Sequence, residues 1–104
     1  MVTMKFKEWA CIVEPAHYGN GRKALVLNED GPSAERIAVA TVNLDDEVCP
    51  ENFAYIKDYS ENEGMADALI EADLIKPKAV MTVKSGHVNV SLYRFTEKAL
   101  TLFK

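Results

Sequence analysis

The chain has 104 residues, of which 48% are hydrophobic and 27% are charged, and its formal net charge at pH 7 is −4. This length and composition are typical of one globular domain with its own core and exclude a chain that is disordered by default. We therefore expect a single domain over residues 1–104. Two cysteines are too few for the disulfide framework of a small secreted domain, so we expect Cys11 and Cys49 to be reduced thiols.

The N-terminal part of the chain predicts strands separated by turns. Residues 4–13 are rich in β-forming side chains and predict a first strand, which Glu14-Pro15 is expected to end. Gly19-Asn20-Gly21 predicts a turn, because Asn and Gly tolerate positive φ, and residues 23–27 predict the strand that follows. Residues 37–44 alternate in a two-residue period and predict a third strand.

The middle of the chain predicts an acidic loop, a strand and the main helix. Residues 45–52 form the loop and residues 53–57 the strand. Ser60 and Glu63 have the spacing of a capping box, which opens a helix by satisfying free backbone N–H groups. An apolar stripe then repeats at helical spacing, as expected of a helix that covers a core. It consists of Met65, Ala68, Leu69 and Ala72.

The C-terminal part predicts a hairpin and a short helix. Residues 79–92 separate best into an apolar and a polar face when Ser85-Gly86 occupies a two-residue turn, which pairs Val83 with Val88. Residues 96–104 predict a short terminal helix. The expected class is therefore α+β: an antiparallel sheet of about five or six strands, with one main helix (about 61–73) packed on one face.

Charge is unevenly distributed along the chain. Residues 1–44 are neutral, residues 45–73 carry ten acids and one base, and residues 74–104 carry one acid and six bases. An acidic surface attracts basic protein surfaces and repels nucleic acid, so direct nucleic-acid binding is disfavoured. Two other interpretations stay open: the fold brings the acidic middle and the basic end together, or the charge serves solubility alone.

The acidic segment supplies the candidate protein-binding residues, and two aromatic residues supply candidate apolar contacts. The acids are Asp45, Asp46, Glu47, Asp58, Glu61, Glu63, Asp67 and Glu71. Tyr93 and Phe95 fall on the polar face of the predicted hairpin, which predicts a bulge, a second layer or an exposed aromatic site. An exposed site of this kind favours self-association, so a homodimer is the alternative to a different protein partner.

No catalytic or metal-binding pattern is complete in this sequence. Asp58, Ser60 and Asn62 alternate like calcium-loop ligands, but the glycine comes one residue late and Leu69 holds the closing position. The histidines and cysteines lack zinc-finger spacing. Nearby carboxylates disfavour a thiolate at Cys49. We therefore expect no catalytic residue, no cofactor and no metal in a protein that is not an enzyme, and keep a small enzyme with an unrecognised cleft as the third alternative.

The longest apolar run near the N-terminus, residues 9–13, is shorter than a signal-peptide core or a membrane span. We therefore expect a cytoplasmic protein that does not contact a membrane.

Four motifs stand together within residues 18–95. They are residues 41–44 (TVNL), 53–64 (FAYIKDYSENEG), 85–86 (SG) and 92–95 (LYRF). Their combination resembles a family of small bacterial proteins catalogued as a domain of unknown function and carried by plasmids and integrative conjugative elements. The resemblance implies a protein-binding module of a mobile element, such as an inhibitor of a host restriction or CRISPR nuclease, or else an accessory or homo-oligomeric structural protein of the element. It transfers no catalytic residue.

Overall fold

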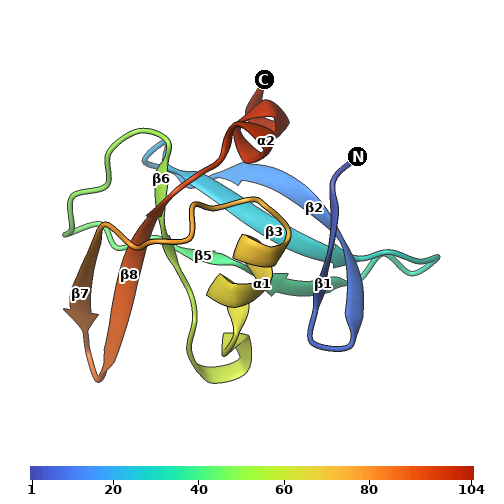
Figure 1. The fold of residues 1–104 in the computed structure, drawn as a ribbon, viewed down its shortest axis with the longest axis horizontal. Coiled ribbons are helices and arrows are strands. Elements are labelled where there is room, and N and C mark those ends of the chain that lie inside the picture. Colours follow the sequence, from blue (N-terminus) through green and yellow to red (C-terminus); the bar gives the residue numbers. More distant parts are fainter.

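The computed structural model describes all 104 residues and contains two four-stranded antiparallel sheets and two short α-helices (Figure 1). The strands are β1 (Thr3–Phe6), β2 (Trp9–His17), β3 (Lys23–Glu29), β4 (Arg36–Val39), β5 (Thr41–Val42), β6 (Phe53–Ile56), β7 (Met81–Ser85) and β8 (Val88–Arg94). The first sheet has the order β1-β2-β3-β4, and the second has the order β5-β6-β8-β7. The expected α+β class is confirmed, but the expected single sheet of five or six strands is wrong.

The two sheets are joined by one segment of chain, whose first part is β4 and whose second part is β5. Ala40 lies between these strands and bonds to both sheets. Its N–H donates to the carbonyl oxygen of Leu25 (2.9 Å), and its carbonyl oxygen accepts from the N–H of Lys57 (2.9 Å). The strand predicted over residues 37–44 therefore changes sheet at Ala40, which divides the expected single sheet in two.

The predicted first strand, residues 4–13, is a hairpin of β1 and β2, and β2 continues through Pro15. The carbonyl oxygen of Ala10 accepts from the N–H of Asp30 (2.9 Å), so the even-numbered residues of β2 bond toward β3. The nitrogen of Pro15 consequently faces the β1 side, where the last bond from β2 is that of the Val13 N–H to the carbonyl oxygen of Val2 (2.9 Å). Proline is tolerated there because no ladder hydrogen bond is lost.

The main helix begins later than the sequence predicted. The helical elements are η1 (Ser60–Asn62, a 3₁₀ turn) and α1 (Met65–Glu71). Ser60 has φ 55° and makes no capping bond. The carboxylate of Asp58 instead accepts from the N–H groups of Gly64 (2.6 Å) and Ala66 (3.3 Å). The predicted capping box of Ser60 and Glu63 is therefore wrong, because the longer reach of Asp58 satisfies the free N–H groups at the start of α1.

The end of α1 is a Schellman motif centred on Asp73, which has φ 61°. The N–H of Asp73 donates to the carbonyl oxygen of Ile70 (2.9 Å), and the N–H of Leu74 donates to that of Leu69 (2.9 Å). Leu69, Leu74 and Met65 are fully buried in the main core. The apolar stripe predicted for this helix is thus confirmed at its two largest residues.

The β7–β8 hairpin has the predicted faces but not the predicted register. Val83 pairs with Val90 rather than with Val88, and the two-residue turn is Gly86-His87. Gly86 has φ 62°, as the first central position of a type II′ turn requires. The turn lies one residue later than predicted, and each residue of β7 meets a partner two positions further along β8. The alternation of faces survives this shift because its period is two residues.

The two faces of the second sheet pack on different apolar clusters. Ala54 and Ile56 of β6 point into the main core, which also contains the buried side chains of α1. Tyr55 points the other way, into a smaller cluster with Leu92 and the half-buried side chains of the loop over residues 43–52. The loop and α1 therefore cover opposite faces of this sheet.

The predicted C-terminal helix is confirmed as two short turns, α2 (Glu97–Leu100) and η2 (Thr101–Phe103). The hydroxyl oxygen of Thr96 accepts from the N–H of Ala99 (3.2 Å) and so caps α2. The ring of Phe103 packs against His17 and Phe95, with centroid distances of 5.5 Å and 5.9 Å. This segment closes one end of the main core (Figure 1).

Candidate protein-binding surfaces

The acidic loop, residues 43–52, is anchored through its backbone. The guanidinium of Arg22 donates to the carbonyl oxygens of Leu44 (Nη1, 2.7 Å) and Glu47 (Nη2, 2.6 Å). The Tyr55 hydroxyl, in the sheet that the loop covers, donates to the carbonyl oxygen of Val48 (2.6 Å). Because Arg22 and Tyr55 bind carbonyl groups, these anchors leave the loop carboxylates free.

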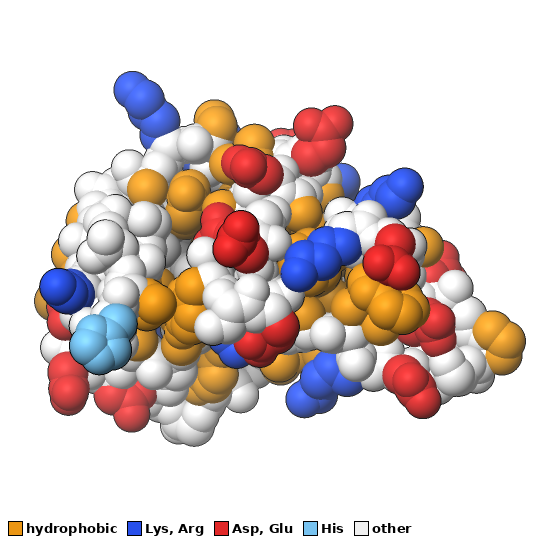
Figure 2. All heavy atoms as spheres, turned by 90° about the horizontal axis from the view of Figure 1, so that it is seen from below, with side chains coloured by type: hydrophobic (Ala, Val, Ile, Leu, Met, Phe, Trp, Pro, Cys, Tyr) orange, Lys and Arg blue, Asp and Glu red, His pale blue; other side chains and the backbone are white.

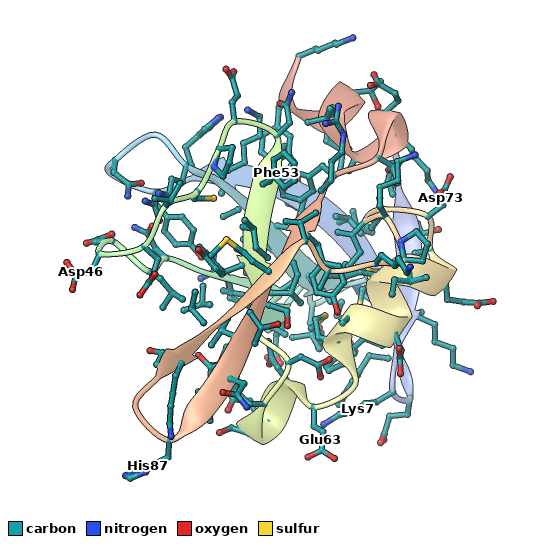
Figure 3. All side chains as sticks on the ribbon, turned by 60° about the vertical axis from the view of Figure 1, so that its left-hand side comes forward. Lys7, Asp46, Phe53, Glu63, Asp73 and His87 are labelled. Atoms are coloured by element: carbon teal, nitrogen blue, oxygen red, sulfur yellow. The ribbon has the colours of Figure 1, made fainter.

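The carboxylates of Asp45 and Asp46 project from this loop toward solvent, and Figure 3 shows Asp46 at its outer tip. Glu47 is half-buried, and the Asn20 side chain amide donates to Asp45 Oδ1 (3.3 Å). No basic side chain lies within 4 Å of any of these three carboxylates. The loop therefore presents negative charge on a backbone that is fixed by long-range hydrogen bonds.

Two shallow hollows flank the loop. The first, of about 250 Å³, is lined by Asn20, Gly21, Arg22, Lys23, Cys49, Pro50, Glu51, Asn52 and Phe53. Burial raises the pKa of the Cys49 thiol, although the Arg22 charge acts in the opposite direction. Neither His17 nor His87 lines this hollow. The arrangement therefore does not supply Cys49 with the base that a nucleophilic cysteine needs.

The second hollow, of about 330 Å³, lies between the loop and the end of β7. It is lined by Asn43, Leu44, Asp45, Asp46, Glu47, Lys84 and Ser85. Leu44 is its one apolar lining residue. This hollow brings the loop acids, which are far away in the sequence, next to the hairpin.

A second acidic group lies on the other side of the second sheet. It consists of Glu63, Asp67 and Glu71, which we call the acidic ridge. All three side chains are exposed, and none lies within 4 Å of a basic side chain. Figure 3 shows Glu63 at a different side of the molecule from Asp46. Six of the eight candidate acids thus form two surfaces rather than one acidic face.

The remaining two candidate acids have structural partners. Asp58 uses both carboxylate oxygens to cap α1. Glu61 pairs with Lys57 (2.7 Å), which is the one ion pair of the structure. This pairing lowers the pKa of the Glu61 carboxyl and raises the pKa of Lys57. Lys7 also reaches this turn, where its amino group donates to the carbonyl oxygen of Glu61 (2.8 Å).

The basic C-terminal third does not form ion pairs with the acidic segment. None of its six basic side chains lies within 4 Å of a carboxylate. Lys98 donates to the carbonyl oxygen of Ala72 (2.7 Å), and the Arg94 guanidinium lies 5.6 Å from the ring centroid of Phe53. Figure 2 shows one face of the molecule, on which acidic, basic and apolar side chains alternate. No ion pair therefore neutralises the acidic ridge.

The two candidate apolar contact residues are placed differently from the sequence expectation. Phe95 is 1% exposed and packs against Phe103 in the main core, so an exposed contact at Phe95 is wrong. Tyr93 is half-buried against the same core. Burial raises the pKa of the Tyr93 hydroxyl, and Asp58 and Asp67 act in the same direction. Of the alternatives that the sequence left open, a second packed layer is the one observed.

No three or more His, Cys, Asp or Glu side chains are grouped so that they could hold a metal ion. No helix in the structure has the length and apolar character needed to span a membrane. Comparisons with known protein families, with curated proteins and with solved structures find no match.

Proposed function

We propose that this protein is a non-enzymatic protein-binding module that uses the acidic ridge to bind a basic protein surface. The observation that carries the proposal is that Glu63, Asp67 and Glu71 are exposed together without any basic partner within 4 Å. Asp67 and Glu71 are four residues apart on α1, and like charges at this spacing cost about 0.2–0.5 kcal/mol. A partner that brings basic side chains to the ridge relieves this repulsion.

The scaffold under the ridge supports this function because it holds the carboxylates in fixed positions. Met65 and Leu69 anchor α1 in the main core, Asp58 caps its start and Asp73 closes its end. A pre-ordered charged surface loses little entropy on binding. It also accelerates association with an oppositely charged partner.

The resemblance to proteins of mobile elements narrows the class of partner. A nuclease of a host restriction or CRISPR system carries a basic surface where it holds nucleic acid, and an acidic module that covers this surface inhibits it. In this proposal the protein acts in the bacterial cytoplasm, needs no cofactor and does not itself bind nucleic acid. Its net charge of −4 opposes contact with a phosphate backbone.

The test compares two triple variants with the same net charge. Glu63→Lys, Asp67→Lys and Glu71→Lys reverse the ridge, whereas Glu8→Lys, Glu14→Lys and Glu35→Lys reverse three exposed acids elsewhere. Each protein is immobilised and used to capture partners from a host lysate, and the captured nuclease is assayed for DNA cleavage.

We expect the ridge variant to lose capture and inhibition and the control variant to retain both. Capture by the wild type should also weaken as salt is raised, since exposed charges are screened. Equal losses in both variants would mean that net charge alone is responsible, and full capture by the ridge variant would refute the proposal.

A further inference from the structure

The second sheet ends in one strand, β7, whose outer backbone groups make no hydrogen bond to another segment of the chain. The other edge strand of the second sheet, β5, is continuous with β4 of the first sheet. In the first sheet, α1 packs beside the edge strand β1. β7 has β8 on one side only and lies at the outer edge of the molecule (Figure 1). It contains no proline, and its ladder with β8 is regular from Met81 to Ser85, although the N–H of Val80, just before β7, also donates to the carbonyl oxygen of Leu92 (2.9 Å). The usual devices that protect an edge strand from pairing are therefore absent, apart from the charge of Lys84.

The turn determines which backbone groups point outward from β7. Ser85 and Val88 flank the two-residue turn and form its closing hydrogen-bonded pair, so Met81, Val83 and Ser85 bond toward β8. The N–H and C=O groups of the residues between them, Thr82 and Lys84, point to the open edge. These groups are free to pair with another strand.

The open edge is complementary to itself. If two β7 strands lie antiparallel about a two-fold axis at Val83, Thr82 of each copy stands opposite Lys84 of the other. These are the two residues with free backbone groups, so both pairs form the ladder bonds of an antiparallel sheet. The same register places Val83 opposite its own copy and Met81 opposite Ser85. No two like charges stand opposite each other.

The side chains around the edge fit the same arrangement. Val80 and Met81, at the start of β7, are 56% and 42% exposed, although both are large and apolar. Met81 stands opposite Ser85 of the other copy, and Ser85 lines the hollow whose apolar wall is Leu44. A Met81 side chain therefore has a hollow to enter on the facing copy.

We infer that two copies of this chain form a homodimer by antiparallel pairing of their β7 strands, which joins their second sheets into one continuous sheet. The inference does not depend on the acidic ridge, of which Asp67 and Glu71 lie on α1 and Glu63 lies just before it, because α1 covers the face of the sheet opposite to the acidic loop. One short strand pair buries less than the roughly 1,200–2,000 Å² of a typical stable interface. The dimer is therefore expected to be weak and to depend on protein concentration.

The register is tested by a matched pair of substitutions at Thr82, whose side chain is exposed. Thr82→Glu places a carboxylate opposite Lys84 of the other copy, and Thr82→Lys places two ammonium groups opposite each other. Both variants lose the hydroxyl contact with Ser91 (2.7 Å). Sedimentation equilibrium over about 10 µM to 1 mM measures the dissociation constant, and circular dichroism checks that both variants are folded.

We expect Thr82→Glu to tighten the dimer and Thr82→Lys to weaken it, each by roughly 2- to 30-fold, because each charge pair occurs twice in a two-fold dimer. A second measurement uses Val83→Cys, which places two thiols in a facing pair across the axis. Oxidation should then give a covalent dimer through the new thiol, identified by peptide mapping, while the wild type gives none. A monomer at all concentrations, or a dimer whose affinity ignores the charge at position 82, would overturn the inference.

Discussion

Arg22 is the residue whose replacement should most clearly separate the acidic loop from the rest of the fold. Its guanidinium donates to two loop carbonyl groups, at 2.7 Å on Leu44 and 2.6 Å on Glu47. Arg22→Gln removes the planar fork that makes both bonds. We expect the loop to open locally in this variant, because the donors that remain are neutral groups: the Tyr55 hydroxyl on Val48 and the Asn20 side-chain amide on Asn43 and Asp45.

The magnitude follows from the two bonds. A hydrogen bond that involves a charged group contributes about 1.5–3 kcal/mol, and both carbonyl groups regain water when the loop opens, so the lower end applies. Removing both bonds then favours the open loop by about 3 kcal/mol, which is roughly 100-fold in the open population. Cys49 lies in this loop and is half-buried, so its reaction with a thiol reagent reports the opening.

The assay is the rate of thiol labelling at pH 8, followed by mass spectrometry of the two cysteine peptides. Cys11 is buried in the main core and serves as the internal control for global unfolding. Arg22 lowers the pKa of the Cys49 thiol, so its removal reduces the thiolate fraction and slows labelling by itself. A faster reaction at Cys49 therefore cannot come from the change in charge.

Arg22→Lys is the matched control, because it keeps the charge but replaces the fork by a single point donor. It should label at a rate between the wild type and Arg22→Gln. If Cys49 in Arg22→Gln labels at the wild-type rate, Arg22 does not hold the loop. If Cys49 and Cys11 accelerate together, the loop does not open on its own.

Three further predictions concern the stability of the scaffold. Asp73→Gly should raise the free energy of unfolding in urea by about 1 kcal/mol, because an L-residue in the left-handed region costs about 1–2 kcal/mol and glycine does not; unchanged or lower stability would contradict the strain at φ 61°. Asp58→Ala should lower it by about 1–2 kcal/mol through loss of the cap on α1, and Asp58→Asn should recover part of this; equal losses in both variants would contradict the capping role. Burial raises the pKa of both thiols above their ordinary value of 9.0, so the folded state keeps protons that the unfolded chain releases. The contribution of the two thiols to the free energy of unfolding is therefore fully present below pH 9.0 and should be lost as the pH rises through their folded pKa values. Cys49→Ser should reduce this loss. Urea midpoints that stay constant from pH 8 to pH 11 would contradict the expectation.

The sequence predicted those features of the fold that depend on local periodicity. The alternation in β7 and β8 identified their faces correctly, although the choice between Ser85-Gly86 and Gly86-His87 for the turn needed the φ of Gly86. The prediction that the strand ends at Pro15 was wrong for a long-range reason. β1 is too short to lie opposite Pro15, so no hydrogen bond to β1 is lost at its nitrogen. The change of sheet at Ala40 has no local signal at all.

The functional surfaces were harder to predict than the fold. The acidic residues of the ridge were identified from the sequence, but their separation from the acidic loop depends on the alternation of Tyr55 with Ala54 and Ile56 in β6. Arg22 gave no signal, because its partners are carbonyl groups more than twenty residues away. Phe95 was misjudged because the C-terminal turns form a second layer that packs against it through Phe103.

The separation of the two acidic groups implies that they have separable functions. In the proposed dimer the carboxylates of Asp45, Asp46 and Glu47 face the start of the other copy's β7, whereas the ridge stays exposed on the opposite face of the sheet. Reversing the three loop charges to lysine should therefore weaken the dimer and spare capture of a basic partner. Reversing the ridge should have the opposite effects. If either triple variant changes both properties to the same extent, the two surfaces are not independent, and the charge of the chain acts through its total rather than through its placement.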